Sequence, residues 1–232
     1  MDFKKIRMSV ILFVCFILFT ILVKSVDRKP IGPEGSLMGL AGINGAIFRN
    51  VGTSNMWYGL STFFGILVIL VVIGFACLGA YELIRTRDLL SVDPDIYALA
   101  VIYVIMAVLY IIFDKAVIIN YRPLLEDGKL AASYPSSHTL MAVTVMGTAI
   151  IALHKRLKDE KAQFVMSLAA LAVMLFAVLS RALSGYHWFT DICGGMLLGS
   201  ALVALYAALA EYSFELRNKI RAARKERRVY ED

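Results

Sequence analysis

Three short groups of polar residues stand out because their side chains can hold, attack or protonate a phosphoryl group. They are Lys115 with Arg122-Pro123, then Pro135-Ser136-Ser137-His138, then Ser180-Arg181 with His187 and Asp191. Three fixed cations can neutralise phosphoryl oxygens, while two histidines can divide nucleophilic attack and proton donation between them. Together these groups indicate the chemistry of phosphate-ester hydrolysis.

The first group is expected at the end of a helix. Lys115 and Arg122 are seven residues apart, or two helical turns, so a helix would present both cations on one face. Pro123 disfavours helical backbone at Arg122 and is expected to end the element there. A lone lysine at a span end usually extends its amine to the interface. Lys115 differs because Asp114 precedes it and the apolar residues 116–119 follow it, and charge within an apolar run usually serves function.

The second group is typical of a helix start. Pro135 followed by Ser136 predicts an N-cap, so free backbone amides and the positive end of the helix dipole would face the site. Taken alone, the pattern indicates only a cap. His138 changes this interpretation, because a helix terminus that holds phosphate would place the imidazole against the leaving-group oxygen.

The third group contains a histidine and a carboxylate at positions i and i+4. On a helix this spacing puts Asp191 beside the imidazole of His187. Asp191 can then hold the ring N–H and stabilise the imidazolium that forms. A lone histidine near an interface is more often structural, but a His-Asp pair with Arg181 six residues upstream is better explained as a site.

The composition indicates that a bilayer surrounds the elements that position these groups. Of the 232 residues, 59% are hydrophobic and the mean hydropathy is +0.72, far from the soluble norm. Apolar runs cover residues 8–23, 57–83, 96–119, 139–153, 164–183 and 192–212. Most approach the ~20 residues that a spanning helix needs, although the first and fourth are short. The runs predict an all-α fold, a six-transmembrane helix bundle in which residues 1–232 form a single integral-membrane domain.

A cleaved signal peptide is the competing interpretation of the first run, since Lys4, Lys5 and Arg7 precede it. Residues 25–29 lack a small-x-small cleavage site, which favours a retained span.

Basic residues predict the orientation. With the N-terminus in the cytoplasm, most of the 24 lysines and arginines lie on the cytoplasmic side, including those of the basic tail 217–232. The positive-inside rule thus selects six spans with both termini cytoplasmic. All three polar groups then fall on the extracytoplasmic face, where the active site is expected. The net charge of +6 reflects this asymmetry or an anionic leaflet as partner, and no nucleic acid is expected.

The cysteines and the longest connection carry weaker signals. Cys15, Cys77 and Cys193 all lie in apolar runs, so neither a disulfide framework nor a zinc site is indicated, and no metal is expected. The connection 24–56 would be extracytoplasmic, and its residues 32–48 are glycine-rich yet apolar. This segment is compatible with an interfacial helix or partial cap, and equally with a plain connector.

The three groups together resemble a known signature. The pattern K-x6-R-P, then P-S-S-H, then S-R-x5-H-x3-D is similar to that of the type 2 phosphatidic acid phosphatase superfamily, which also includes the vanadium haloperoxidases. All specified positions but one match in order. The resemblance implies a membrane-bound lipid phosphatase in which His187 is the nucleophile that forms a phosphohistidine. Asp191 would be its partner, and His138 would protonate the leaving oxygen.

The resemblance also implies a set of phosphate-binding residues, namely Lys115, Arg122, Ser136, Ser137 and Arg181. It implies no metal and no other cofactor. Ser137 is the one departure, since the family usually has glycine there. Its backbone amide is retained, but close approach of the substrate is tighter.

The first hypothesis is therefore a lipid phosphatase at the outer face of the cell membrane. Undecaprenyl diphosphate, phosphatidylglycerophosphate and phosphatidate are the candidate substrates. A lipid phosphotransferase would use the same site, and a membrane transporter is the alternative from a different class. The lack of inverted repeats and of mid-span charges favours hydrolysis. The sequence leaves the lipid and the oligomeric state open, because apolar lining residues discriminate weakly between substrates.

Overall fold

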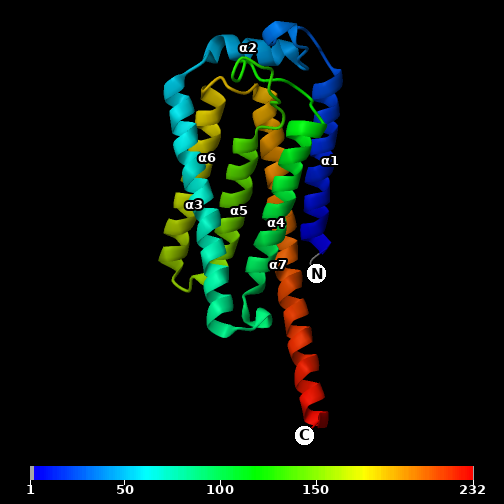
Figure 1. Cartoon of the computed structure of the whole chain (residues 1–232), viewed down its shortest axis with the longest axis vertical. Coiled ribbons are helices and arrows are strands. Elements are labelled where there is room, and N and C mark those ends of the chain that lie inside the picture. The colour runs from blue at the N-terminus through cyan, green and yellow to red at the C-terminus, as the bar shows by residue number, and fades with distance from the viewer. Residues whose placement is uncertain (1–2, 232) are drawn as a thin grey trace.

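Long apolar helices account for most of the protein, and residues 3–231 are the part that the computed structural model describes. Six of the described helices are long and apolar enough to cross a membrane, and they run side by side in an elongated bundle (Figure 1). They are α1 (Phe3–Ser25), α3 (Asn55–Thr86), α4 (Pro94–Ile111), α5 (Ser137–Arg156), α6 (Glu160–Leu183) and α7 (Phe189–Glu231). The predicted all-α fold with six spans is confirmed. The first and fourth spans are longer than their apolar runs, because polar residues at both ends extend helices α1 and α5.

Most of the helices begin where a side chain can satisfy a free amide. The capping side chains precede α3, α4, α5 and α6, and each accepts a hydrogen bond from an amide of the first turn; they are Ser54, Asp93, Ser136 and Asp159. Such caps contribute about 1 kcal/mol each. The cap at Ser136 fixes where the second polar group sits, at the start of α5.

The third span ends earlier than the sequence predicts. After α4, a π turn η3 (Ile112–Ala116) closes the helix, and the connection that follows is not helical. The prediction that Lys115 and Arg122 share one helical face is therefore wrong. Residues 117–119 are β-branched, which disfavours helix, and the Arg122 amide bonds instead to the Ala131 carbonyl at 2.9 Å.

Two helices form the centre of the bundle. Half of the apolar window of α5 and of α7 is buried, against 11–17% in the other four spans. Glycines allow the two backbones to approach closely: a Cβ on Gly195 would lie 2.8 Å from the Ser136 carbonyl oxygen, and one on Gly199 would lie 2.8 Å from Val143. The start of α5 is thus held against the start of α7, where the Ser136 amide donates to the Asp191 carbonyl at 2.9 Å.

A short helix lies across one end of the bundle (Figure 1). Within the connection 24–56, a 3-10 turn η1 (Pro33–Gly35) precedes α2 (Ala41–Val51). Asn44 anchors α2 to α7: its Nδ2 donates to Thr190 Oγ1 at 3.0 Å, and its Oδ1 accepts from the Thr190 amide at 3.2 Å. This contact places α2 over the segment that leads into Asp191.

The opposite end carries the 3-10 turn η2 (Leu89–Ser91) and the extension of α7, which projects well past the other helices (Figure 1). The predicted basic tail covers residues 217–232. Its side chains from residue 224 onward, and residue 232 altogether, lie outside the described part of the chain.

Candidate active site

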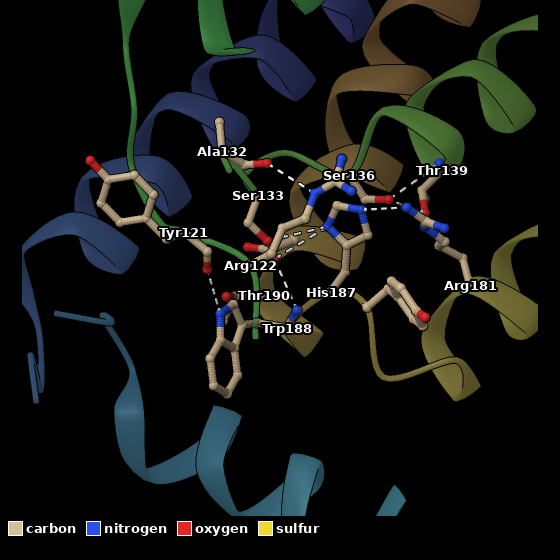
Figure 2. Close-up of polar contacts among 12 residues, drawn as sticks. Tyr121, Arg122, Ala132, Ser133, Ser136, Thr139, Arg181, His187, Trp188 and Thr190 are labelled. Carbon is tan, nitrogen blue, oxygen red and sulfur yellow. Dashed lines mark hydrogen bonds and ion pairs between the residues drawn. The ribbon is translucent and has the colours of Figure 1, made fainter. Parts of the chain in front are cut away.

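Residues from each of the three polar groups meet at the end of the bundle that α2 covers. Arg122, Ser133, Ser137 and His187 line one cavity, between the connection 117–136 and the starts of α5 and α7. Figure 2 shows Arg122, His187 and Arg181 converging from separate parts of the chain. Residues more than 60 positions apart in the sequence thus form one site.

His187 and Asp191 lie side by side, although not on one helix as the spacing suggested. The α7 helix starts at Phe189, so His187 precedes it and Asp191 sits in its first turn. The His187 Nδ1 atom is 3.5 Å from Asp191 Oδ2, and both side chains are buried. The same oxygen accepts a hydrogen bond from the Trp188 amide at 2.9 Å and another from the hydroxyl of Ser133. The carboxylate is therefore held by three groups at once.

Arg181 is a buried cation with unused donors. Its side chain is 1% exposed, and its Nη2 donates to His187 Nε2 at 3.0 Å. Its Nε and Nη1 have no hydrogen-bond partner among the described residues. The guanidinium lies 5.6 Å from the ring centroid of Tyr58, which stacks on Tyr186. Because a buried charge is costly unless paired, the free N–H groups indicate a position for an anion.

Arg122 faces the same cavity from the connection 117–136. Its Nη1 pairs with Glu126 at 2.9 Å, and its Nε donates to the Ala132 carbonyl at 3.3 Å. The side chain is mostly buried, so the second cation of the site is fixed by backbone contacts and one exposed carboxylate.

Lys115 is not brought into the cavity. Its amine pairs with Asp114 at 2.8 Å and its side chain is 78% exposed, whereas Asp114 is the residue of this pair that lines the cavity. The predicted role of Lys115 as a phosphate ligand stays a prediction.

At the start of α5, one residue caps the helix and the next two present free backbone amides. Ser136 is fully buried, and its hydroxyl caps the helix by accepting from the amide and hydroxyl of Thr139. The amides of Ser137 and His138 have no acceptor within the described residues. Ser137 has no positive φ, so a side chain is tolerated where the family usually has glycine. The free amides supply donors for an anion next to Ser137.

His138 lies at the edge of the site. Among the described residues its ring has no hydrogen-bond partner, and it lines an apolar groove with Met106, Tyr110 and Met141. An unengaged imidazole at the rim is available for proton exchange with a bound molecule.

The charge state of His187 follows from its surroundings. Burial lowers the pKa of His187 well below its ordinary value of 6.5, and the cations Arg181 and Arg122 act in the same direction. Its ring is therefore neutral at pH 7 and carries one nitrogen lone pair, as a nucleophile requires.

Several residues of the site carried no signal in the sequence. Ser133, Tyr58 and Asn44 contact the site from irregular segments or from distant helices, and no spacing rule connects them with His187 or Asp191. Trp188 also belongs here: its Nε1 donates to the Tyr121 carbonyl at 2.7 Å and ties the two connections together (Figure 2). Among these residues, Trp188 alone had a sequence signal, because it directly follows His187.

The fold defines a multi-pass membrane protein with a candidate active site at one end of the bundle. The chain matches the PAP2 superfamily over residues 96–215, just over half its length, and it belongs to that superfamily. The resemblance drawn from the three sequence groups is confirmed.

A solved structure shares the fold. It is the crystal structure of the first transmembrane PAP2 type phosphatidylglycerolphosphate phosphatase from Bacillus subtilis. The TM-score is 0.63 at 19% identity, over 88% of this chain and 96% of the other. No curated protein matches the chain.

Proposed function

We propose that the protein is an integral-membrane lipid phosphatase that removes phosphate from a lipid monoester or diphosphate through a phosphohistidine. The observation that carries the proposal is the pair formed by buried Arg181, with two unpartnered donors, and neutral His187 at 3.0 Å. Membership of the superfamily and the phosphatase of the same fold support it.

The chemistry uses two steps. The phosphoryl group binds between Arg181, Arg122 and the free amides of Ser137 and His138, and it replaces His187 as the partner of Arg181. His187 Nε2 then attacks phosphorus, so that a P–N bond forms while the P–O bond to the lipid breaks and His138 protonates the leaving oxygen. In the second step a water gives a proton to His138 and attacks phosphorus, so that a new P–O bond forms while the P–N bond to His187 breaks. Inorganic phosphate leaves and His187 is regenerated.

The surroundings of His138 support a lipid as the leaving group. The groove that His138 lines lies between α4 and α5, and apolar side chains form most of it, including Met106, Leu140 and Met141. Ser137 lines both this groove and the cavity with Arg122 and His187. A molecule with a phosphate at one end and an apolar chain at the other fits this continuous arrangement.

A panel of lipids tests the proposal. We expect purified protein in detergent to release phosphate from phosphatidylglycerophosphate, undecaprenyl diphosphate or phosphatidate, and to do so in excess EDTA. Fixed cations Arg122 and Arg181 neutralise the phosphate charge, and the described residues contain no group of three side chains that could hold a metal ion. The first lipid is the natural starting point, because the structural neighbour is named for it.

Other results of the panel discriminate between the alternatives. A folded protein that releases phosphate from none of these lipids contradicts the proposal and favours a transporter. Transfer of labelled phosphate to an added acceptor lipid identifies a phosphotransferase. Activity lost in EDTA and restored by one divalent ion requires a different mechanism.

We also propose that the site faces outward from the cell membrane with both termini in the cytoplasm, as the basic residues predict. The test is a matched pair, Lys129→Cys and Lys158→Cys, in a background that lacks Cys15, Cys77 and Cys193. Both lysines are exposed, and only Lys129 lies at the end with the site. A membrane-impermeant thiol reagent added to intact cells is expected to label Lys129→Cys and not Lys158→Cys. The reverse pattern places the site in the cytoplasm.

A further inference from the structure

One serine stands between the proposed nucleophile and its carboxylate. Ser133 is 2% exposed, and its hydroxyl donates a short hydrogen bond to Asp191 Oδ2. The same Oγ lies 3.3 Å from His187 Nδ1, nearer than the 3.5 Å that separates this nitrogen from Asp191 Oδ2. Figure 2 shows the serine beside the histidine ring. The ring therefore contacts the carboxylate directly and also through a hydroxyl that lies closer to Nδ1.

The hydrogen bonds around His187 specify which of its ring nitrogens carries the proton. A serine hydroxyl has a single proton, and here Asp191 accepts it, so Ser133 Oγ can only accept from the ring. His187 Nδ1 must then carry the proton. The contact at the other ring nitrogen indicates the same arrangement. Nε2 lies 3.0 Å from Arg181 Nη2, and because a guanidinium only donates, Nε2 must accept. Both contacts specify the same tautomer, with the lone pair on Nε2.

We propose that Ser133 is a positioning residue that, together with Asp191, holds His187 as the Nδ1–H tautomer and aims its Nε2 lone pair at the phosphoryl group. The inference rests on the proposed function. Ser133 touches no reacting atom, and its effect passes through the orientation and tautomer of the ring.

The backbone of Ser133 is held independently of its hydroxyl. Its amide donates to the Asn120 carbonyl at 3.0 Å, and Asp191 keeps a second bond from the Trp188 amide. Removal of the hydroxyl is therefore expected to loosen the imidazole at Nδ1, while Arg181 still contacts Nε2 and the loop and the carboxylate stay in place.

The kinetic test compares Ser133→Ala with Ser133→Thr. We expect Ser133→Ala to lower kcat by about 10²-fold, as misorientation of a reacting group does, with KM within about twofold of wild type. Ser133→Thr keeps the hydroxyl and is expected to restore most of the rate. The matched control is Ser9→Ala, which removes an equally buried hydroxyl that donates to the Ala201 carbonyl, ten residues beyond Asp191 on α7. It is expected to leave kcat unchanged.

A second measurement does not depend on turnover. The chain has three histidines, so the ring nitrogens of His187 can be assigned by NMR of protein labelled with nitrogen-15 histidine and by comparison with His138→Gln and His154→Gln. Wild type is expected to show a neutral ring protonated at Nδ1. Ser133→Ala is expected to keep the proton on Nδ1, because Arg181 still donates to Nε2, and to shift the Nδ1 signal because that N–H has lost its nearest acceptor.

The two readouts separate the inference from the proposed function. A wild-type protein that hydrolyses none of the lipids but shows the Nδ1–H ring, with an Nδ1 signal that shifts in Ser133→Ala, supports the role of Ser133 while the phosphatase assignment fails. Wild-type kcat together with an unchanged ring spectrum in Ser133→Ala overturns the role. A rate loss that Ser133→Thr does not restore, with an unchanged spectrum, also overturns it.

Discussion

His187→Ala is expected to reduce phosphate release by at least about 10⁴-fold, the scale on which loss of a nucleophile acts. The reason is geometric: among the described residues, His187 is the histidine whose ring nitrogen hydrogen-bonds to Arg181, so its loss removes the proposed attacking atom. The measurement is phosphate release from the best lipid of the panel, with size-exclusion chromatography to show that the variant is folded.

The control for this variant is His154→Ala. His154 lies near the other end of α5, where its Nε2 is 2.9 Å from the Ser167 hydroxyl, so its loss is expected to leave the rate unchanged. Wild type incubated with lipid carrying radioactive phosphate and quenched in alkali should retain label on the protein, because phosphohistidine survives alkali and hydrolyses in acid. Near-wild-type release by a folded His187→Ala removes the residue from its proposed role.

Arg181→Lys is expected to lower kcat/KM by about 10³-fold while keeping the positive charge. The guanidinium offers several donors in a fixed plane, with Nη2 on His187 and both Nε and Nη1 free for phosphoryl oxygens. An ammonium is a point charge that cannot reproduce this geometry, and it loses the stacking of the guanidinium over Tyr58. The loss is to be measured on the same lipid, together with inhibition by inorganic phosphate, which should weaken in parallel.

Arg156→Lys provides the same chemical change at the opposite end of the bundle. Arg156 is mostly buried and pairs with Glu82 at 3.3 Å, so its replacement tests whether any buried arginine is equally sensitive. We expect wild-type kcat/KM for this variant. Equal losses in Arg181→Lys and Arg156→Lys point to a folding effect and contradict a role for Arg181 in holding phosphate.

Much of the fold was predictable because a bilayer imposes strong rules on sequence. Spanning helices require long apolar runs, and basic residues between them predict orientation, so the six spans followed from composition and charge. The ends of the spans were less predictable. The third run continued in apolar residues to position 119, yet the helix closes in a π turn at Ala116, where local backbone bonding overrides hydropathy.

The candidate site was predictable where function demands particular residue types at short spacing. Arg181, His187 and Asp191 fall within eleven positions of one another, and the structure places them in contact. The contacts of Ser133 and Asn44 could not be predicted, because they join residues 54 and 146 positions apart, and no spacing rule connects the segments involved. Lys115 shows the converse: its sequence motif is intact, but the π turn directs its amine to Asp114.

The central pair α5 and α7 and the outer helix α4 supply different parts of the candidate site. Asp191 and the cap at Ser136 belong to the closely packed central pair, whereas Met106 and Tyr110 of the apolar groove belong to α4, an outer helix. On the proposed function, a substitution of Met106 would therefore reshape the space for a lipid chain while the central pair keeps Asp191 and the Ser136 cap in place. On that proposal, proteins of this fold would diverge toward different lipids while the residues that react with phosphate stay the same.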